Sequence, residues 1–165
     1  MSGAGSVPDT ADAVRTLNAR LDDELLSLAD SVPAADLLRT PGGQEWSAGQ
    51  LLAHAAEFPH FFAADLRRWR EDPTAVVGRT HDHEARLTAV DDPFQGLELA
   101  VAAVREALAD LAGALRPFVD ADLTAGTVNV KYGDEPLTAF LDRYVLGHKA
   151  GHVEQLRRTL AALAG

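Results

Sequence analysis

The chain has 165 residues, enough for one domain with a single substantial core. Apolar residues make up 47% of it, with many Ala and Leu and few β-branched or aromatic residues, which favours helices over sheets. The net charge of −10 predicts a surface that repels phosphate, so we expect neither a nucleic-acid partner nor an anionic membrane.

The sequence also lacks cysteine, a membrane-spanning segment and a signal-peptide pattern. It has no cysteine, so a metal site must use histidine and carboxylate ligands. No apolar run approaches the ~18 residues that a membrane helix requires. Residues 1–8 are small, predict a flexible N-terminus and lack the basic and apolar regions of a signal peptide. We therefore expect one cytoplasmic domain that spans residues 1–165.

The first predicted helix runs from about Asp9 to Ser31 and is amphipathic. Proline and glycine at Pro33 and in residues 41–43 then indicate a connection. Along the helix, apolar residues recur at spacings of three and four, as on one helical face: Val14, Leu17, Leu21, Leu25 and Leu28.

The second predicted helix has a clear start signal. Ser47 and Gln50 have the spacing of a capping box, with Trp46 and Leu51 as its hydrophobic staple. Pro59 predicts a kink inside the helix, which ends near residues 72–73. One stripe of the helix carries Leu51, His54, Phe58, Phe61, Asp65 and Trp69.

The rest of the chain predicts two more helices. Residues 73–91 are polar and resemble a long crossover, and a third helix is expected from Asp92-Pro93 to about Phe118. After a second irregular stretch with a short extended piece at 127–132, Pro136 begins the last helix, which ends near Leu163. These elements predict an all-α fold, a four-helix bundle with a long crossover between its second and third helices.

Three histidines lie on the inward faces of two predicted helices. Each residue advances about 100° around a helix, which places His148 and His152 on the same stripe as Leu141 and Tyr144. Histidines at i and i+4 can reach one cation together, and His54 on a facing helix completes an open three-ligand metal site. The alternative is that all three are core histidines with ordinary hydrogen bonds. Burying several unpaired polar rings is costly, which favours the metal site.

Other polar residues near these histidines have two interpretations each. Glu57 can be a fourth ligand, an outer hydrogen-bond acceptor or a general base, or else an edge carboxylate facing water. Tyr144 can donate a hydrogen bond to a bound substrate or simply pack in the core. Gln155 can orient a ligand ring or lie exposed. His60 is expected on the surface, because it points about 120° away from His54.

The remaining histidines, His81 and His83, lie in the polar crossover. They could bind metal or gate the site, but a solvated loop is the favoured interpretation because no pattern fixes their position.

Two segments resemble a known family. Residues 46–54, WSAGQLLAH, are similar to the Trp-Ser…His segment of the DinB/YfiT-like metal-dependent enzymes. Residues 148–157, HKAGHVEQLR, resemble their closing His-x-x-x-His-x-x-Gln segment. The resemblance implies a four-helix bundle with a divalent metal, typically zinc or nickel, held by His54, His148 and His152, and often a homodimer. The chain departs from the pattern at Lys149, where many relatives carry Asp.

Two reactions fit a three-histidine metal, which lowers the pKa of a bound water or thiol. One is hydrolysis by bound hydroxide, and the other is transfer of a low-molecular-weight thiol to a small electrophilic substrate. The resemblance favours the second, because several relatives are bacillithiol- or mycothiol-dependent transferases and isomerases. The composition favours mycothiol. In this hypothesis Glu57 or Tyr144 handles the proton.

Two further hypotheses remain open at the level of sequence. A helical bundle without metal could bind a partner or small ligand and perform no chemistry. A closed structural metal site, with Glu57 as its fourth ligand, would also use the same histidines.

Overall fold

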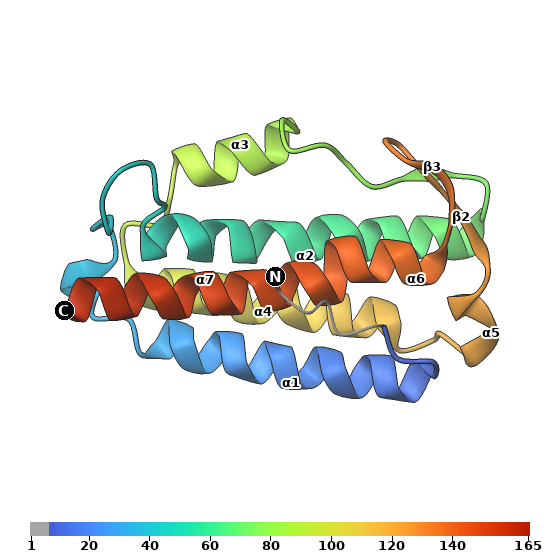
Figure 1. Cartoon of the computed structure of the whole chain (residues 1–165), viewed down its shortest axis with the longest axis horizontal. Helices are drawn as coiled ribbons and strands as arrows, with labels where there is room; N and C mark the ends of the chain where they lie inside the picture. Colours follow the sequence, from blue (N-terminus) through green and yellow to red (C-terminus); the bar gives the residue numbers. More distant parts are fainter. Residues whose placement is uncertain (1–6) are drawn as a thin grey trace.

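The structure is a computed structural model that describes residues 7–165, so most of the predicted flexible N-terminus lies outside the described residues. Its four long helices are α1 (Ala11–Asp30), α2 (Ala48–Glu71), α4 (Leu97–Leu115) and α7 (Gly147–Ala164). They lie side by side in a bundle, in which α1 and α2 each contact both α4 and α7 (Figure 1). The predicted helical-bundle fold is confirmed.

The start of α2 follows the predicted capping box. Ser47 Oγ accepts a hydrogen bond from the Gln50 backbone N–H at 3.1 Å, and Gln50 Oε1 accepts one from the Ser47 N–H at 2.9 Å. The helix continues through Pro59 to Glu71 without interruption. Because these bonds set where the helix begins, they also set its phase, and His54 two turns later is buried.

The crossover between α2 and α4 is more ordered than the sequence indicates. It contains strand β1 (Val76–Val77) and helix α3 (Glu84–Asp91), whose first turn is capped by His83 Nδ1, which accepts from the Ala85 N–H. Helix α3 has eight residues and buries only Val90, so no apolar period marks it. Gly96, and not Asp92, is the residue before α4. Two further short helices, η1 (Ala34–Asp36) and α5 (Asp120–Leu123), lie in other connections.

A small sheet at one end of the bundle joins the crossover to the last helix (Figure 1). Strand β2 (Gly126–Asn129) pairs parallel with β1, Val76 opposite Val128, and antiparallel with β3 (Gly133–Pro136). The sequence predicted only one extended piece here, because a two-residue strand such as β1 is recognisable only from its pairing. The sheet places residues 78–79 of the crossover beside the last helix.

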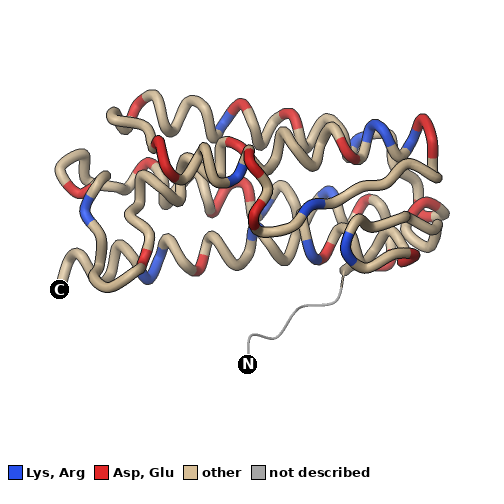
Figure 2. Tube along the Cα trace, turned by 90° about the horizontal axis from the view of Figure 1, so that it is seen from above, with Lys and Arg blue, Asp and Glu red and all other residues tan. Residues whose placement is uncertain are grey.

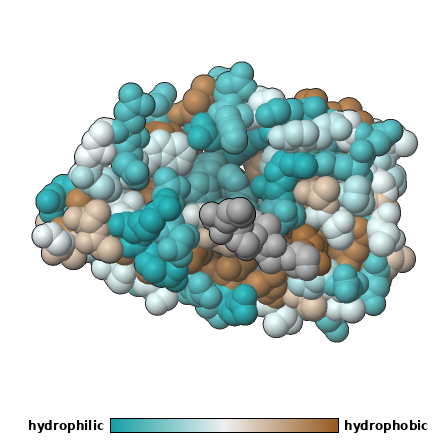
Figure 3. Space-filling model, viewed as in Figure 1, coloured by the Kyte–Doolittle hydropathy of each residue, from teal (hydrophilic) through white to brown (hydrophobic). Residues whose placement is uncertain are grey.

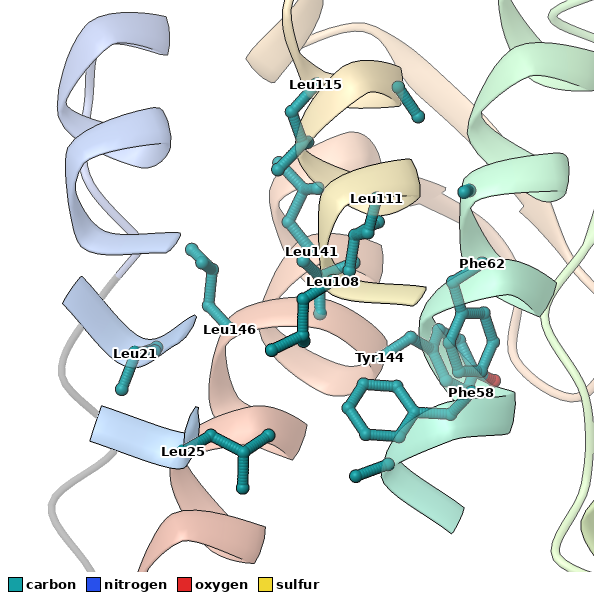
Figure 4. Close-up of a cluster of buried hydrophobic side chains, with 14 of the residues drawn as sticks. Leu21, Leu25, Phe58, Phe62, Leu108, Leu111, Leu115, Leu141, Tyr144 and Leu146 are labelled. Carbon is teal, nitrogen blue, oxygen red and sulfur yellow. The ribbon is translucent and has the colours of Figure 1, made fainter. Parts of the chain in front are cut away.

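That last helix is a continuous rod of three parts. Helix α6 (Leu137–Phe140) leads into η2 (Leu141–Leu146), which is π-helical, and then into α7. Its inner face packs on α1, α2 and α4 in a core of leucine and phenylalanine side chains (Figure 4). Charged residues of both signs are distributed along the chain trace (Figure 2). None of the helices within residues 7–165 is long and apolar enough to cross a membrane.

One charged side chain is buried inside the bundle. Lys149 on α7 is 0% exposed, and its ammonium donates to Asn18 and Asp22 on α1. This position is the one at which the sequence departs from the family pattern. The lysine therefore joins α1 to the helix that carries His148, and its charge depends on the half-buried Asp22 as its counter-ion.

We expect Asp22→Ala to lower the free energy of unfolding by about 3–5 kcal/mol, because it leaves the Lys149 ammonium buried without a counter-ion. Urea unfolding followed by circular dichroism measures this loss. Asp23→Ala, an exposed carboxylate on the same helix, is the matched control and should change stability by at most about 0.5 kcal/mol. Equal stability of the two variants would contradict the buried ion pair.

Candidate functional site

Three histidine rings meet between α2 and α7. His54 Nε2 lies 3.0 Å from His148 Nε2, which lies 3.1 Å from His152 Nε2. One ligand atom from each residue falls within 4.8 Å of the others. His54 is buried, whereas His148 and His152 are half-buried. The convergence predicted from helical periodicity is therefore present in the structure.

The donor geometry is compatible with a single bound cation. Nitrogens bound at 2.0–2.1 Å to one tetrahedral metal lie about 3.3 Å apart, close to the separations found here. Gln155 Oε1 lies 3.2 Å from His152 Nδ1, so a ring that donates its Nδ1 proton to Gln155 has a free lone pair on Nε2. The orienting role considered for Gln155 in the sequence thus has a contact that supports it.

The three rings are uncharged at neutral pH. Burial first, and then the neighbouring rings His152 and His54, lower the pKa of His148 to about 2. Burial and His54 lower the pKa of His152 to about 3, and burial lowers that of His54. Neutral imidazole is the form that binds metal, so the site needs no proton to leave before a cation enters.

The π-helical segment and one glycine set the position of His148. A Cβ on Gly147 would lie 2.5 Å from the Asp142 carbonyl oxygen, so the close approach of these two residues requires glycine. Such π-helical turns shift the phase of the residues that follow and often occur at functional sites. Gly151, between the two histidines, has open space around it and lines the cavity.

Glu57 lies on the Nδ1 side of His54, away from the other two rings, and pairs with Arg79, which lines the cavity. Glu57 Oε2 is 3.5 Å from His54 Nδ1, a buried atom with no hydrogen-bond partner among residues 7–165. Arg79 donates to both oxygens of Glu57, at 2.8 Å for one of them. Although burial raises the pKa of Glu57, the hydrogen bonds from Arg79 and the nearby His54 ring bring it down to about 2. Glu57 is therefore an anion held by Arg79 and does not line the cavity, and its role as a general base stays a prediction.

The sequence reasoning did not identify Arg79, because it lies in a crossover without periodicity. Its buried guanidinium lies over the rings of Phe61 and Phe62, 4.4 and 5.2 Å from their centroids. The one local signal is the preceding Gly78, whose φ of +87° is unusual for other residues. Glycine there marks a special backbone position but does not indicate which neighbour has a role.

Gly78 is bound by Asp65, a residue that the sequence placed on the same helical stripe as His54. Asp65 on α2 accepts a hydrogen bond from the Gly78 N–H at 2.7 Å. A Cβ on Gly78 would lie 2.8 Å from Asn129 Nδ2 and 2.9 Å from the Tyr144 hydroxyl. Tyr144 in turn donates to the Arg79 carbonyl at 3.3 Å and accepts from Asn129 Nδ2 at 3.1 Å. The sheet, α2 and η2 therefore fix the Arg79 segment together.

A cavity of about 860 Å³ opens over the three histidines. On the face seen in Figure 3, a hollow lined mostly by hydrophilic side chains is visible. Trp46 forms part of its wall, parallel to the His152 ring at 6.5 Å between centroids. Tyr144 also lines the cavity, but it is buried and its hydroxyl is bonded to protein groups, so its contact with a substrate stays a prediction. A volume of this size suits a small molecule.

The other three histidines lie apart from the ring cluster. His60 is exposed and pairs with Asp110, in agreement with its predicted surface position. His83 caps α3 and packs against Phe61, while His81 is exposed at the cavity. Neither His81 nor His83 joins the group of residues that can hold a metal.

Solved structures of three other proteins have this fold. The colibactin self-resistance protein ClbS in complex with a dsDNA matches with a TM-score of 0.72 and 10% identity, over 93% of this chain and 97% of that one. An uncharacterised protein from Clostridium difficile 630 matches with a TM-score of 0.69 and 9% identity, over 92% of this chain and 96% of that one. A mutant of the mycothiol-dependent maleylpyruvate isomerase matches with a TM-score of 0.66 and 17% identity, over 98% of this chain and 71% of that one. No curated protein matches the sequence.

The ClbS complex corrects one expectation drawn from composition. We expected no nucleic-acid partner because the net charge is −10. That exclusion is wrong, since a protein with this fold is found bound to dsDNA. The physical reason is that net charge is summed over the whole surface, whereas binding depends on the potential at one face.

The sequence itself identifies the family. The profile of the DinB superfamily matches residues 18–156, from the middle of α1 to α7. This range contains all three converging histidines and, apart from Arg157, both segments on which the resemblance was based. The chain belongs to the DinB superfamily.

Proposed function

We propose that this protein is a metal-dependent enzyme in which His54, His148 and His152 hold a divalent ion, zinc or nickel. The observation that carries the proposal is the convergence of three neutral Nε2 atoms at 3.0 and 3.1 Å beside an open cavity. A bound divalent ion would supply Lewis acidity that makes a coordinated thiol or water a nucleophile near neutral pH. Within residues 7–165 no carboxylate joins the three histidines in the metal-binding group, which favours a catalytic site with an open position over a closed structural one.

We further propose that the reaction is transfer of a low-molecular-weight thiol, or a thiol-dependent isomerisation, on a small electrophilic substrate. The chain has no cysteine, so the thiol would come from a small molecule such as mycothiol. The structural likeness to a mycothiol-dependent isomerase supports this choice over hydrolysis. The cavity of about 860 Å³ offers room for a small substrate next to the histidines.

The surrounding residues would have distinct roles in this reaction. Glu57 would accept the Nδ1 proton of His54 and so keep Nε2 directed at the metal, a positioning role and not a catalytic one. Arg79 would hold Glu57 in place. Tyr144, whose hydroxyl is already bound to Asn129 and the Arg79 carbonyl, would place a hydrogen-bonding group at the cavity wall.

Untagged protein is expected to bind one zinc or nickel ion per chain, and His54→Ala, His148→Ala and His152→Ala should each weaken binding. The loss should exceed the roughly 10–100-fold that follows removal of an outer hydrogen-bond partner. Elemental analysis measures the bound metal per chain, and titration with a competing chelator measures the metal affinity of each variant. His60→Ala, an exposed histidine, is the control and should bind as the wild type does. Absence of bound metal and of metal uptake would refute the proposed site.

Glu57→Gln is expected to lower metal affinity by about 10–100-fold, because Nδ1 of His54 loses its anionic neighbour. The control is Glu45→Gln, which removes an exposed carboxylate at the cavity without touching His54. Circular dichroism should confirm that both variants are folded. If the two variants bind metal equally, Glu57 has no role in orienting the ligand.

The thiol reaction predicts turnover that requires both metal and thiol. Metal-loaded protein, incubated with mycothiol and a panel of small electrophiles, should consume thiol or isomerise the substrate, and chelation should abolish this. The wild type and His148→Ala are compared by mass spectrometry of the products. Product formation without any thiol would instead indicate hydrolysis by bound hydroxide.

A further inference from the structure

The wall of the cavity has the opposite charge to the protein as a whole. The chain carries a net charge of −10, yet the cavity is lined by one carboxylate, the exposed Glu45, and by five cationic side chains. These are Arg79, Arg86, Lys131, Arg143 and Arg158. They come from the crossover, α3, the β2–β3 turn, η2 and α7, so separate elements bring positive charge to one place.

Three of the five cations are not neutralised by the protein. Arg79 is paired with Glu57, and Arg143 donates to both oxygens of Glu135 at 2.7 and 2.8 Å. Arg86, Lys131 and Arg158 form no ion pair with any residue in the described part of the chain. Three free positive charges thus face a single exposed carboxylate.

Arg86 is the best placed of the three to bind a ligand. Its guanidinium lies 5.1 Å from the centre of the Trp46 ring, and Nη1 donates to the His81 carbonyl at 2.8 Å. Trp46 is itself next to His152 and His54, with ring centroids 6.5 and 5.7 Å apart. Arg86 is therefore held at the histidine end of the cavity, and its remaining N–H groups have no partner among residues 7–165.

The cations and the three histidines line the same cavity. An anion held by these cations would therefore lie close to the histidine rings. The planar fork of an arginine matches the two oxygens of a carboxylate or phosphate, and a partly buried site strengthens this attraction.

We propose that the substrate of this site is a small molecule with a carboxylate or phosphate group, which Arg86 binds while its reactive part lies over the three histidines. Lys131 and Arg158, both exposed at the cavity, attract the anion and guide it inward. A neutral or cationic substrate would leave these charges without a partner. The inference deepens the proposed function and rests on it for the reaction, but the anion site itself requires no metal.

Isothermal titration calorimetry with succinate, inorganic phosphate and the neutral analogue succinamide tests the proposal. Each probe is titrated into chelator-treated and zinc-loaded wild-type protein at low and high salt. Succinate or phosphate should bind in both forms, more weakly as salt is raised, and succinamide should not bind. The anion that binds more tightly identifies the group recognised. Equal binding of succinate and succinamide, or binding of neither anion, would overturn the proposal.

Variants then locate the site. Arg86→Gln should weaken anion binding about tenfold, the loss expected when a charged hydrogen bond is removed. Arg116→Gln removes the same charge from an exposed position outside the cavity and should have less than about a twofold effect, by its small electrostatic contribution. Circular dichroism checks that both variants fold. Equal affinities of the two variants would refute the role of Arg86.

The same experiment separates this proposal from the metal site and from DNA. His148→Ala should keep anion binding in the chelator-treated protein even though it loses metal. If the wild type binds no metal but Arg86-dependent anion binding persists, the proposed enzyme function fails and the anion site stands. A short DNA duplex that displaces succinate and loses affinity in Arg86→Gln would reassign these cations to the phosphate backbone and overturn the small-molecule proposal.

Discussion

The convergence of three imidazole rings, one buried and two half-buried, is the constraint on which the site depends. The bundle keeps His148 and His152 neutral, with pKa values of about 2 and 3, and brings their Nε2 atoms to 3.1 Å. Polar rings without strong partners are costly in a core, so stability alone does not favour this arrangement. A bound cation would supply the missing interaction, and the convergence of the three rings is the observation behind the proposed metal site.

Two parts of the fold outside the four long helices maintain this arrangement. The small sheet carries the crossover to the last helix, where Gly78 fits against Asn129 and Tyr144 without room for a side chain. Arg79 follows directly and fixes Glu57 behind His54. In the last helix, the π-helical turn and Gly147 determine where His148 points. Small irregularities in the helical frame thus determine the position of the histidines.

The parts of the site that the sequence predicts are those that follow helical periodicity. The capping box at Ser47 sets the phase of α2, and the i, i+4 spacing of His148 and His152 puts both on one face, so their meeting with His54 could be expected. Arg79 could not be expected, because a crossover has no period and its pairing with Glu57 depends on tertiary structure. Helix α3 and strand β1 were missed for the same reason, since each is short and buries little.

The distribution of charge shows that a negative net charge does not exclude an anion-binding cavity. Acidic residues exceed basic ones by 25 to 15, yet the cavity wall collects cations from five separate elements. Low-dielectric walls concentrate the field of the few charges that line a concave site, so these dominate over the many charges on the outer surface. An acidic protein can therefore attract an anion to one place while it repels anions elsewhere. This difference would give the site selectivity, because an anion would gain free energy only where the histidines are also within reach.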